Sequence, residues 1–147
     1  MIDRIREDTL HLMKIPGLSG HEEQVRSFIK EELKKIGLTP FFDKFGNITV
    51  TFPGAGPRVM LFTHMDQLGL IVRKIEDDGF LRFERVGGVP EKILPGLAIS
   101  AISKNGSALP GIIGIKSHHA TQPEEKYKVL SYRDLYIDLG MATAAEV

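Results

Sequence analysis

The sequence predicts an α/β fold built in two parts, with helices and strands in the first part and strands alone in the second. Residues 2–36 carry two hydrophobic patterns of helical period, and short β-rich runs follow them up to residue 63. From Leu68 onward the helical period is absent, and short apolar runs alternate with glycine-containing turns. Helices followed by clustered strands are typical of an α/β layer, whereas frequent short strands are typical of a small barrel or sandwich. We therefore predict one part over residues 1–68 and a β-rich part over residues 69–147.

The first two elements are predicted to be helices. The first pattern has helical spacing at Ile2, Ile5, Thr9, Leu12 and Met13. Pro16-Gly17 ends it, because proline cannot continue a helix. The second pattern is a stripe formed by Val25, Phe28, Ile29, Leu33 and Ile36. Ser19-Gly-His-Glu22 before this stripe has the form of a capping box, and Gly37 after it supplies a left-handed C-terminal stop.

The strands are predicted from β-rich runs and the turns between them. Three runs follow the helices, at residues 38–42, 47–52 and 58–63. Two hairpins are then expected, because Asp78-Gly79 and Asn105-Gly106 suit the positive φ of a tight turn. The first hairpin joins residues 68–75 to residues 80–86, and the second joins residues 98–103 to residues 109–115.

Composition limits the function classes. The 147 residues are 42% hydrophobic, which is enough for a domain with a core. Lys plus Arg balance Asp plus Glu at 19 each, so no basic field exists to hold nucleic acid or an anionic membrane. Cysteine is absent, which excludes disulfides and thiolate metal sites. The sequence has no signal-peptide pattern and no apolar run long enough to span a membrane, so we expect a soluble cytoplasmic protein.

His64 and Asp66 are the candidate functional residues, at the polar end of the apolar run 58–63. Residues two apart on a strand share a face, so the predicted strand would place the imidazole beside the carboxylate. A metal-binding histidine is usually held by such a carboxylate. A hydrogen-bonded structural histidine at a strand end is the alternative, and the pattern alone leaves both open.

The chain resembles the M42 family of metallo-aminopeptidases, which includes glutamyl aminopeptidase and the tetrahedral aminopeptidases. The similar motifs run in family order over nearly the whole chain. They are Pro16-Gly-Leu-Ser-Gly20 before Glu22-Glu23, Asp43-Lys-Phe-Gly-Asn47, Thr63-His-Met-Asp-Gln-Leu-Gly69, Gly79-Phe-Leu-Arg-Phe83, Val86-Gly-Gly88, Gly111-Ile-Ile-Gly-Ile-Lys116, Pro123-Glu-Glu125 and Asp134-Leu-Tyr-Ile-Asp-Leu-Gly140. The family usually has glutamate where this chain has Gln67.

This resemblance implies a cytoplasmic hydrolase that uses two divalent metal ions, zinc or cobalt, to remove N-terminal residues from peptides. It implies a catalytic α/β lobe, with helices on a mixed sheet, followed by a small β-barrel-like dimerisation lobe. In that scheme residues 1–68 are part of the catalytic lobe and residues 69–147 are the dimerisation lobe. His64 corresponds to the first metal ligand, and Asp66 to the carboxylate that orients its ring. A homo-dimer or larger homo-oligomer is also implied.

The family's remaining ligands and its glutamate base would come from segments after Val147. Thr143-Ala-Ala-Glu146 is also a capping box with a single residue left to cap, a pattern that fits a truncated helix and equally a terminus that frays. A catalytic zinc usually has three protein ligands, so we expect weak or no metal binding and no competent peptidase in this chain alone.

Two other interpretations stay open from the sequence. The first is a non-catalytic self-association module, or the remnant of a truncated gene, because the runs 47–52 and 58–63 would be exposed without covering helices. The second is another metal-dependent hydrolase on the same scaffold, since related folds act on different substrates.

Overall fold

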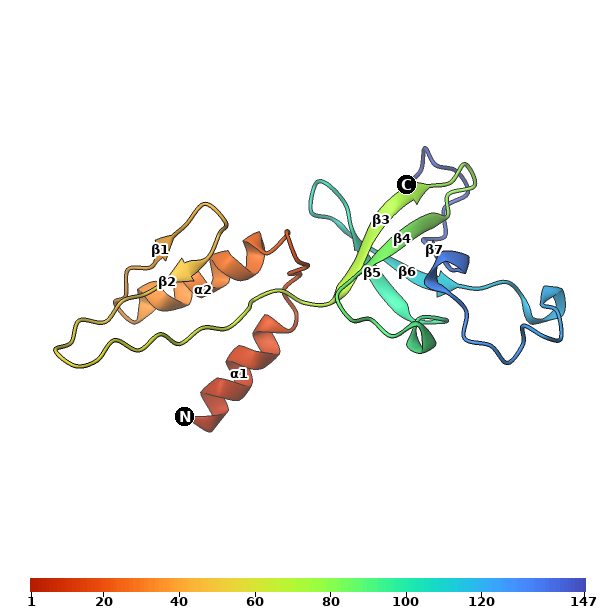
Figure 1. Cartoon of the computed structure of the whole chain (residues 1–147). Helices are drawn as coiled ribbons and strands as arrows, with labels where there is room; N and C mark the ends of the chain where they lie inside the picture. The colour runs from red at the N-terminus through yellow and green to blue at the C-terminus, as the bar shows by residue number, and fades with distance from the viewer. The chain divides into compact units, whose positions relative to one another are not determined.

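The computed structural model describes residues 1–147 and divides into two compact units, Met1–Gln67 and Leu68–Val147 (Figure 1). The first unit contains helices α1 (Ile2–Leu12) and α2 (Glu23–Lys35) and the short strands β1 (Phe41–Phe42) and β2 (Ile48–Thr49). The second unit contains β3 to β7 and three single-turn 3₁₀ segments. The chain is therefore mixed α/β, with both α-helices in the first unit. None of its helices has the length and apolar character needed to cross a membrane.

The predicted C-terminal stop of α2 is confirmed. Gly37 has φ +78°, its N–H donates to the carbonyl of Lys34 at 2.9 Å, and the N–H of Leu38 donates to the carbonyl of Leu33 at 3.0 Å. These two bonds form a Schellman motif, in which glycine takes the left-handed position because it has no Cβ. Along the predicted stripe Val25 is buried, whereas Ile36 is more than half exposed.

The predicted capping box of α2 is wrong. The helix begins at Glu23 with Glu22 as its N-cap, and no side chain caps it. Ser19 donates its hydroxyl hydrogen to Asp66 instead, while the Glu22 carboxylate accepts from the N–H of Gly20 at 2.7 Å. Because the N-cap is Glu22, Ser19 lies three residues before the position from which a side chain accepts from the first N–H groups of the helix, and its hydroxyl bonds to a residue 47 positions away.

The predicted strand over residues 58–63 is also wrong. The chain from residue 50 to residue 66 contains no helix or strand, and the side chains of Leu61 and Phe62 are 93% and 88% exposed. A strand is stabilised by hydrogen bonds to a neighbouring strand, and no segment of the chain pairs with this one. The two runs before it form β1 and β2, which are shorter than predicted and pair antiparallel with Phe42 opposite Ile48.

The second unit is built on one curled antiparallel sheet of five strands, in the order β3-β4-β7-β6-β5. Its strands are β3 (Gly69–Ile75), β4 (Leu81–Val86), β5 (Ala98–Ile102), β6 (Ala108–Gly114) and β7 (Tyr136–Asp138). Both predicted hairpins are present, β3 with β4 and β5 with β6. Gly79 and Gly106 have φ of +82° and +84° in their turns, the region that glycine reaches without strain.

The core of the second unit lies on one face of this sheet. It consists of Leu81, Phe83, Leu94, Ile113, Leu135 and Ile137. Leu81 and Phe83 of β4 point into it while Arg82 and Glu84 are less buried, which is the two-residue alternation of a half-buried strand. Leu94 follows the 3₁₀ segment Glu91–Ile93 and is completely buried. This core holds β7 in the middle of the sheet, at the junction of the two hairpins.

The second predicted capping box does not begin a helix. Residues 144–146 form a turn, in which the N–H of Glu146 donates to the carbonyl of Thr143 at 3.1 Å. The Glu146 carboxylate accepts from the N–H of Ala142 at 3.0 Å. This segment returns to the β3–β4 turn, where the N–H of Ala144 donates to the carbonyl of Asp77 at 3.3 Å. A single turn has too few hydrogen bonds to offset helix nucleation, so contacts to the hairpin decide its conformation.

Candidate functional site

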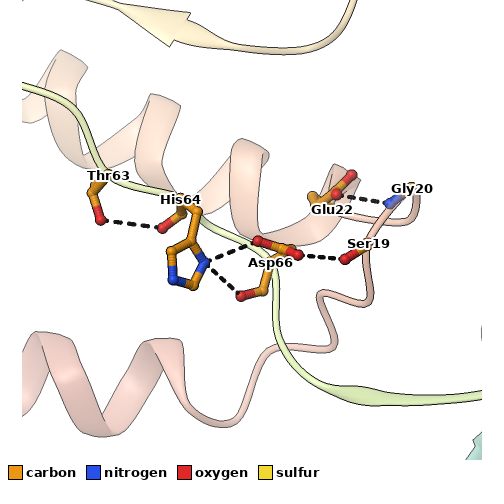
Figure 2. Close-up of polar contacts among 6 residues, drawn as sticks. All are labelled: Ser19, Gly20, Glu22, Thr63, His64 and Asp66. Atoms are coloured by element: carbon orange, nitrogen blue, oxygen red, sulfur yellow. Dashed lines mark hydrogen bonds and ion pairs between the residues drawn. The ribbon is translucent and has the colours of Figure 1, made fainter. Parts of the chain in front are cut away.

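The structure brings His64 and Asp66 into contact in the first unit (Figure 2). The Nδ1 atom of His64 lies 2.9 Å from Asp66 Oδ1 and 3.1 Å from the backbone carbonyl oxygen of Asp66. The contact forms in an irregular segment, so it depends on local turning of the backbone and not on a shared strand face. The two candidate residues therefore lie together without the strand from which their proximity was predicted.

The partners of Nδ1 fix the tautomer of the neutral His64 ring. An ionised carboxylate and a carbonyl can only accept hydrogen bonds, so Nδ1 must carry the hydrogen that they share. The lone pair is then on Nε2, which has no hydrogen-bond partner in the protein, and the side chain is 84% exposed. Nε2 is consequently free to donate its lone pair to a metal ion, or to accept a hydrogen bond from a ligand.

Ser19 completes a three-residue chain of hydrogen bonds. Figure 2 shows its hydroxyl at Asp66, on the carboxylate oxygen that His64 does not use. The hydrogen bond from Ser19 is the largest cause that lowers the pKa of Asp66; desolvation opposes it as the second largest, and the bond from His64 lowers the pKa further. Asp66 is therefore held as a carboxylate at neutral pH, the form that accepts from both neighbours.

The loop between α1 and α2 holds the candidate segment in place. The N–H of Gln67 donates to the carbonyl of Gly17 at 2.7 Å, and Leu18 and Gln67 form a parallel bridge. The side-chain amide of Gln67 donates to the carbonyl of Leu12 at 3.2 Å. Gly17 is buried against Val25, and a Cβ at this position would lie 2.6 Å from a methyl group of that side chain. These contacts place the end of the irregular segment beside Ser19.

Sequence reasoning missed Ser19 as a member of the site. The serine was assigned to a helix cap, which is the common use of serine before a helix. A usable signal was present, because Ser19 stands between the glycines of Pro16-Gly-Leu-Ser-Gly20, one of the motifs shared with the family described above. No sequence rule connects that loop to Asp66, since their contact depends on tertiary structure.

The donor set of this chain fits a single metal ligand and not a complete metal centre. His64 offers one imidazole nitrogen whose orientation is fixed. No group of three or more His, Cys, Asp or Glu residues in the chain could hold a metal ion. Because a catalytic zinc usually has three protein ligands, the two-metal site implied by the resemblance does not fit this chain alone.

Three comparisons with known proteins agree on a family. The family model for M42 glutamyl aminopeptidase matches residues 46–147. The lysyl aminopeptidase of Pyrococcus furiosus is 29% identical over 92% of this chain and 39% of its own length. The TET aminopeptidase of the Thaumarchaeota archaeon SCGC AB-539-E09 is 32% identical with a TM-score of 0.85, over 92% of this chain and 38% of that chain. The Pyrococcus horikoshii TET1 peptidase is 34% identical with a TM-score of 0.84, over 95% and 42%.

The chain spans about two fifths of the length of these three relatives, from 38% to 42%. Within this chain the match is nearly complete, because the structural alignments extend to residues outside the family model. The family model alone covers more than half of the chain, and its match includes His64 and Asp66. The chain therefore belongs to the M42 glutamyl aminopeptidase family of hydrolases.

Proposed function

We propose that these residues form part of an aminopeptidase that uses two divalent metal ions, zinc or cobalt, to hydrolyse N-terminal residues from peptides. Family membership supports the reaction class. The observation that carries the proposal to this chain is the oriented imidazole of His64, with Nδ1 on Asp66 and Nε2 free and exposed. Such an arrangement is common for metal-binding histidines, because the carboxylate fixes the ring and raises its basicity.

In this proposal His64 is a ligand of one metal ion through Nε2, and Asp66 orients the ring. When bound, divalent ions of this kind activate water and polarise the scissile carbonyl. The chain has no group of three or more His, Cys, Asp or Glu residues that could hold a metal ion, so in this proposal the other ligands come from elsewhere in the peptidase. We therefore expect the isolated chain to bind metal weakly and to have no peptidase activity, since a single imidazole cannot hold two ions.

The test is a chimera in which residues 1–147 replace the matching segment of the Pyrococcus horikoshii TET1 peptidase. We expect the folded chimera to hydrolyse aminoacyl-coumarin substrates with zinc or cobalt, and His64→Ala to abolish this activity. His21→Ala is the matched control, because His21 is an exposed histidine of the same unit whose side chain makes no hydrogen bond. A folded chimera that is inactive, or one that tolerates His64→Ala, would contradict the proposal, as would His64-dependent turnover by the homogeneous 147-residue chain.

We further propose a cytoplasmic homo-oligomer in which the second unit is the barrel-like dimerisation lobe. The sheet carries partly exposed apolar side chains at Ile71, Val72, Ile102 and Ile112, which a partner surface would cover. The Pyrococcus horikoshii TET1 peptidase, which is similar over 95% of this chain, can assemble into a tetrahedron or a large octahedral shell. Sedimentation velocity of the chimera would test this, and a stable monomer would contradict it.

A second candidate function is a non-catalytic self-association module. The observation that favours it is the exposed apolar segment around Leu61 and Phe62, which the isolated chain leaves uncovered. An unpaired extended segment of this composition can pair with another copy. Concentration-dependent dimerisation of the 147-residue chain that is lost on replacing these two side chains with lysine would support this function.

A further inference from the structure

We propose that Ser19 is a positioning residue, whose hydroxyl locks the Asp66 carboxylate so that the His64 ring presents Nε2 outward. This inference rests on the proposed role of His64 as a metal ligand. It assigns a function to a loop residue that lies 45 positions before the histidine in the sequence and bonds to Asp66 instead of to the histidine.

Both oxygens of the Asp66 carboxylate are engaged, each by a different residue. Oδ1 accepts from His64 Nδ1 at 2.9 Å, and Oδ2 accepts from the hydroxyl of Ser19. A carboxylate bound at one oxygen can turn about its terminal torsion, which is broad for aspartate. A second donor on the other oxygen stops this rotation. Ser19 therefore determines the orientation of the carboxylate plane that accepts the hydrogen bond from His64 Nδ1.

Ser19 is itself held by the backbone around it. The adjacent Leu18 bridges to Gln67, and Gly17 accepts from the N–H of Gln67 at 2.7 Å. Asp66 and Ser19 therefore lie on two chain segments that are fixed to each other next to the contact. This backbone pairing restricts the position of Ser19 relative to Asp66, because the serine backbone can move only together with the paired segment.

The hydroxyl of Ser19 does not cap helix α2. Helix α2 begins at Glu23 without a side-chain cap, and the side chain of Glu22 bonds to the N–H of Gly20. Loss of the hydroxyl thus removes no helix cap, and the expected consequence falls on Asp66 alone. This separation makes a positioning role distinguishable from a role in the stability of the fold.

The His64 ring depends strongly on this arrangement, because it is 84% exposed and its polar contacts are both with Asp66. If the carboxylate rotates away, Nδ1 keeps only the backbone carbonyl oxygen of Asp66 at 3.1 Å as an acceptor, so the neutral ring carries its hydrogen on Nε2 for a larger share of the time. In that tautomer the lone pair needed by a metal ion lies on Nδ1, on the side facing Asp66. Ser19→Ala should therefore mix the two tautomers and weaken metal binding by about tenfold, the lower end of the range seen when groups supporting a ligand are lost.

The experiment is long-range ¹H–¹⁵N correlation spectroscopy of the His64 ring in the 147-residue chain, followed by a Zn²⁺ titration on the same resonances. We expect wild type to show the Nδ1–H tautomer, Ser19→Ala a mixture, and Ser19→Thr the wild-type pattern because threonine keeps the hydroxyl. Ser27→Ala, an exposed serine of α2, is the matched control and should leave the ring unchanged. Backbone amide spectra establish that each variant is folded.

The outcomes separate this inference from the proposed function. A tautomer in Ser19→Ala equal to wild type overturns the inference, whether or not Zn²⁺ shifts the His64 signals. A loss of the wild-type tautomer in Ser19→Thr also overturns it, because the hydroxyl is then not sufficient. A tautomer change that occurs only in Ser19→Ala supports the positioning role. If in that case the folded chimera keeps its activity with His64→Ala, the positioning role stands and the metal-ligand role of His64 is overturned.

Discussion

Alanine at two hairpin glycines should destabilise the second unit by different amounts, although the two glycines share a backbone conformation. Gly79 in the β3–β4 turn has φ +82°, and Gly106 between β5 and β6 has φ +84°. An alanine in this left-handed region costs about 1 to 2 kcal/mol, because its Cβ approaches the following carbonyl oxygen. The structure leaves no heavy atom within 4 Å of a Cβ at position 106. Gly106→Ala should therefore lose about 1 to 2 kcal/mol of unfolding free energy and no more.

Position 79 adds a steric effect. A Cβ there would lie 2.7 Å from the carbonyl oxygen of Met141 and 3.2 Å from the backbone nitrogen of Thr143. These are backbone atoms that cannot rotate away, so the segment must move and lose the bond between Ala144 and Asp77. One hydrogen bond contributes about 0.5 to 1.5 kcal/mol net. Gly79→Ala should then destabilise by about 2 to 3 kcal/mol, roughly 1 kcal/mol more than Gly106→Ala.

Tyrosine fluorescence during urea unfolding measures this difference. The chain has three tyrosines, all after residue 126, and no tryptophan, so the signal reports the second unit alone. The unfolding free energies of wild type and the two variants are compared only if their dependence on urea concentration has the same slope, because a changed slope would indicate a changed unfolded state. Equal losses in the two variants, or a larger loss in Gly106→Ala, would refute the reasoning from backbone contacts.

Three further changes test other parts of the structure. Leu94→Ala should cost about 2 to 5 kcal/mol on the same tyrosine signal, because the side chain is completely buried in the core, and a loss below about 1 kcal/mol would contradict that packing. Asp43 accepts hydrogen bonds from Asn47, and these lower the pKa of Asp43 in the folded state. The contribution of Asp43 to folding stability is therefore present at neutral pH and is lost as the pH falls through this lowered pKa. Measured by circular dichroism of the helices, Asp43→Ala should lower the melting temperature at pH 7, and the difference from wild type should shrink towards about pH 2. A difference that stays the same at all pH values would contradict this pH dependence. Leu61→Lys with Phe62→Lys should reduce self-association without lowering the melting temperature, since both side chains are exposed, and a lower melting temperature would show that they are packed.

Elements whose signals are local in the sequence were predicted well. The hairpins of the second unit follow from Asp78-Gly79 and Asn105-Gly106, and both glycines have the positive φ that these dipeptides favour. The end of α2 follows from Gly37 in the same way. In these cases the residue that determines the conformation lies inside the element, so no knowledge of the tertiary structure is needed.

Elements that depend on distant partners were not predicted. The run 58–63 has the composition of a buried strand but has no neighbouring strand, so it remains irregular. Strand β7 was missed because it is three residues long, although the alternating burial of Leu135 and Ile137 was visible as alternating apolar residues. Its place between β4 and β6 depends on the core and not on its own sequence.

The candidate site was only partly accessible from the sequence. Proximity of His64 and Asp66 was expected from their spacing, but the contact arises from a local turn of an irregular segment. The third member, Ser19, was assigned to a helix cap. Its hydroxyl bonds to a carboxylate 47 residues away, and the helix starts too late for Ser19 to be its N-cap. The tertiary structure, and not the local motif, determines this partner.

A crystal structure of the chimera loaded with zinc would test the central claim most directly, that His64 is a metal ligand oriented by Asp66. We expect Nε2 of His64 at about 2.0 to 2.1 Å from a zinc ion, with Nδ1 still bonded to the Asp66 carboxylate. Zinc bound away from His64, or bound through Nδ1 with Asp66 displaced, would contradict the claim.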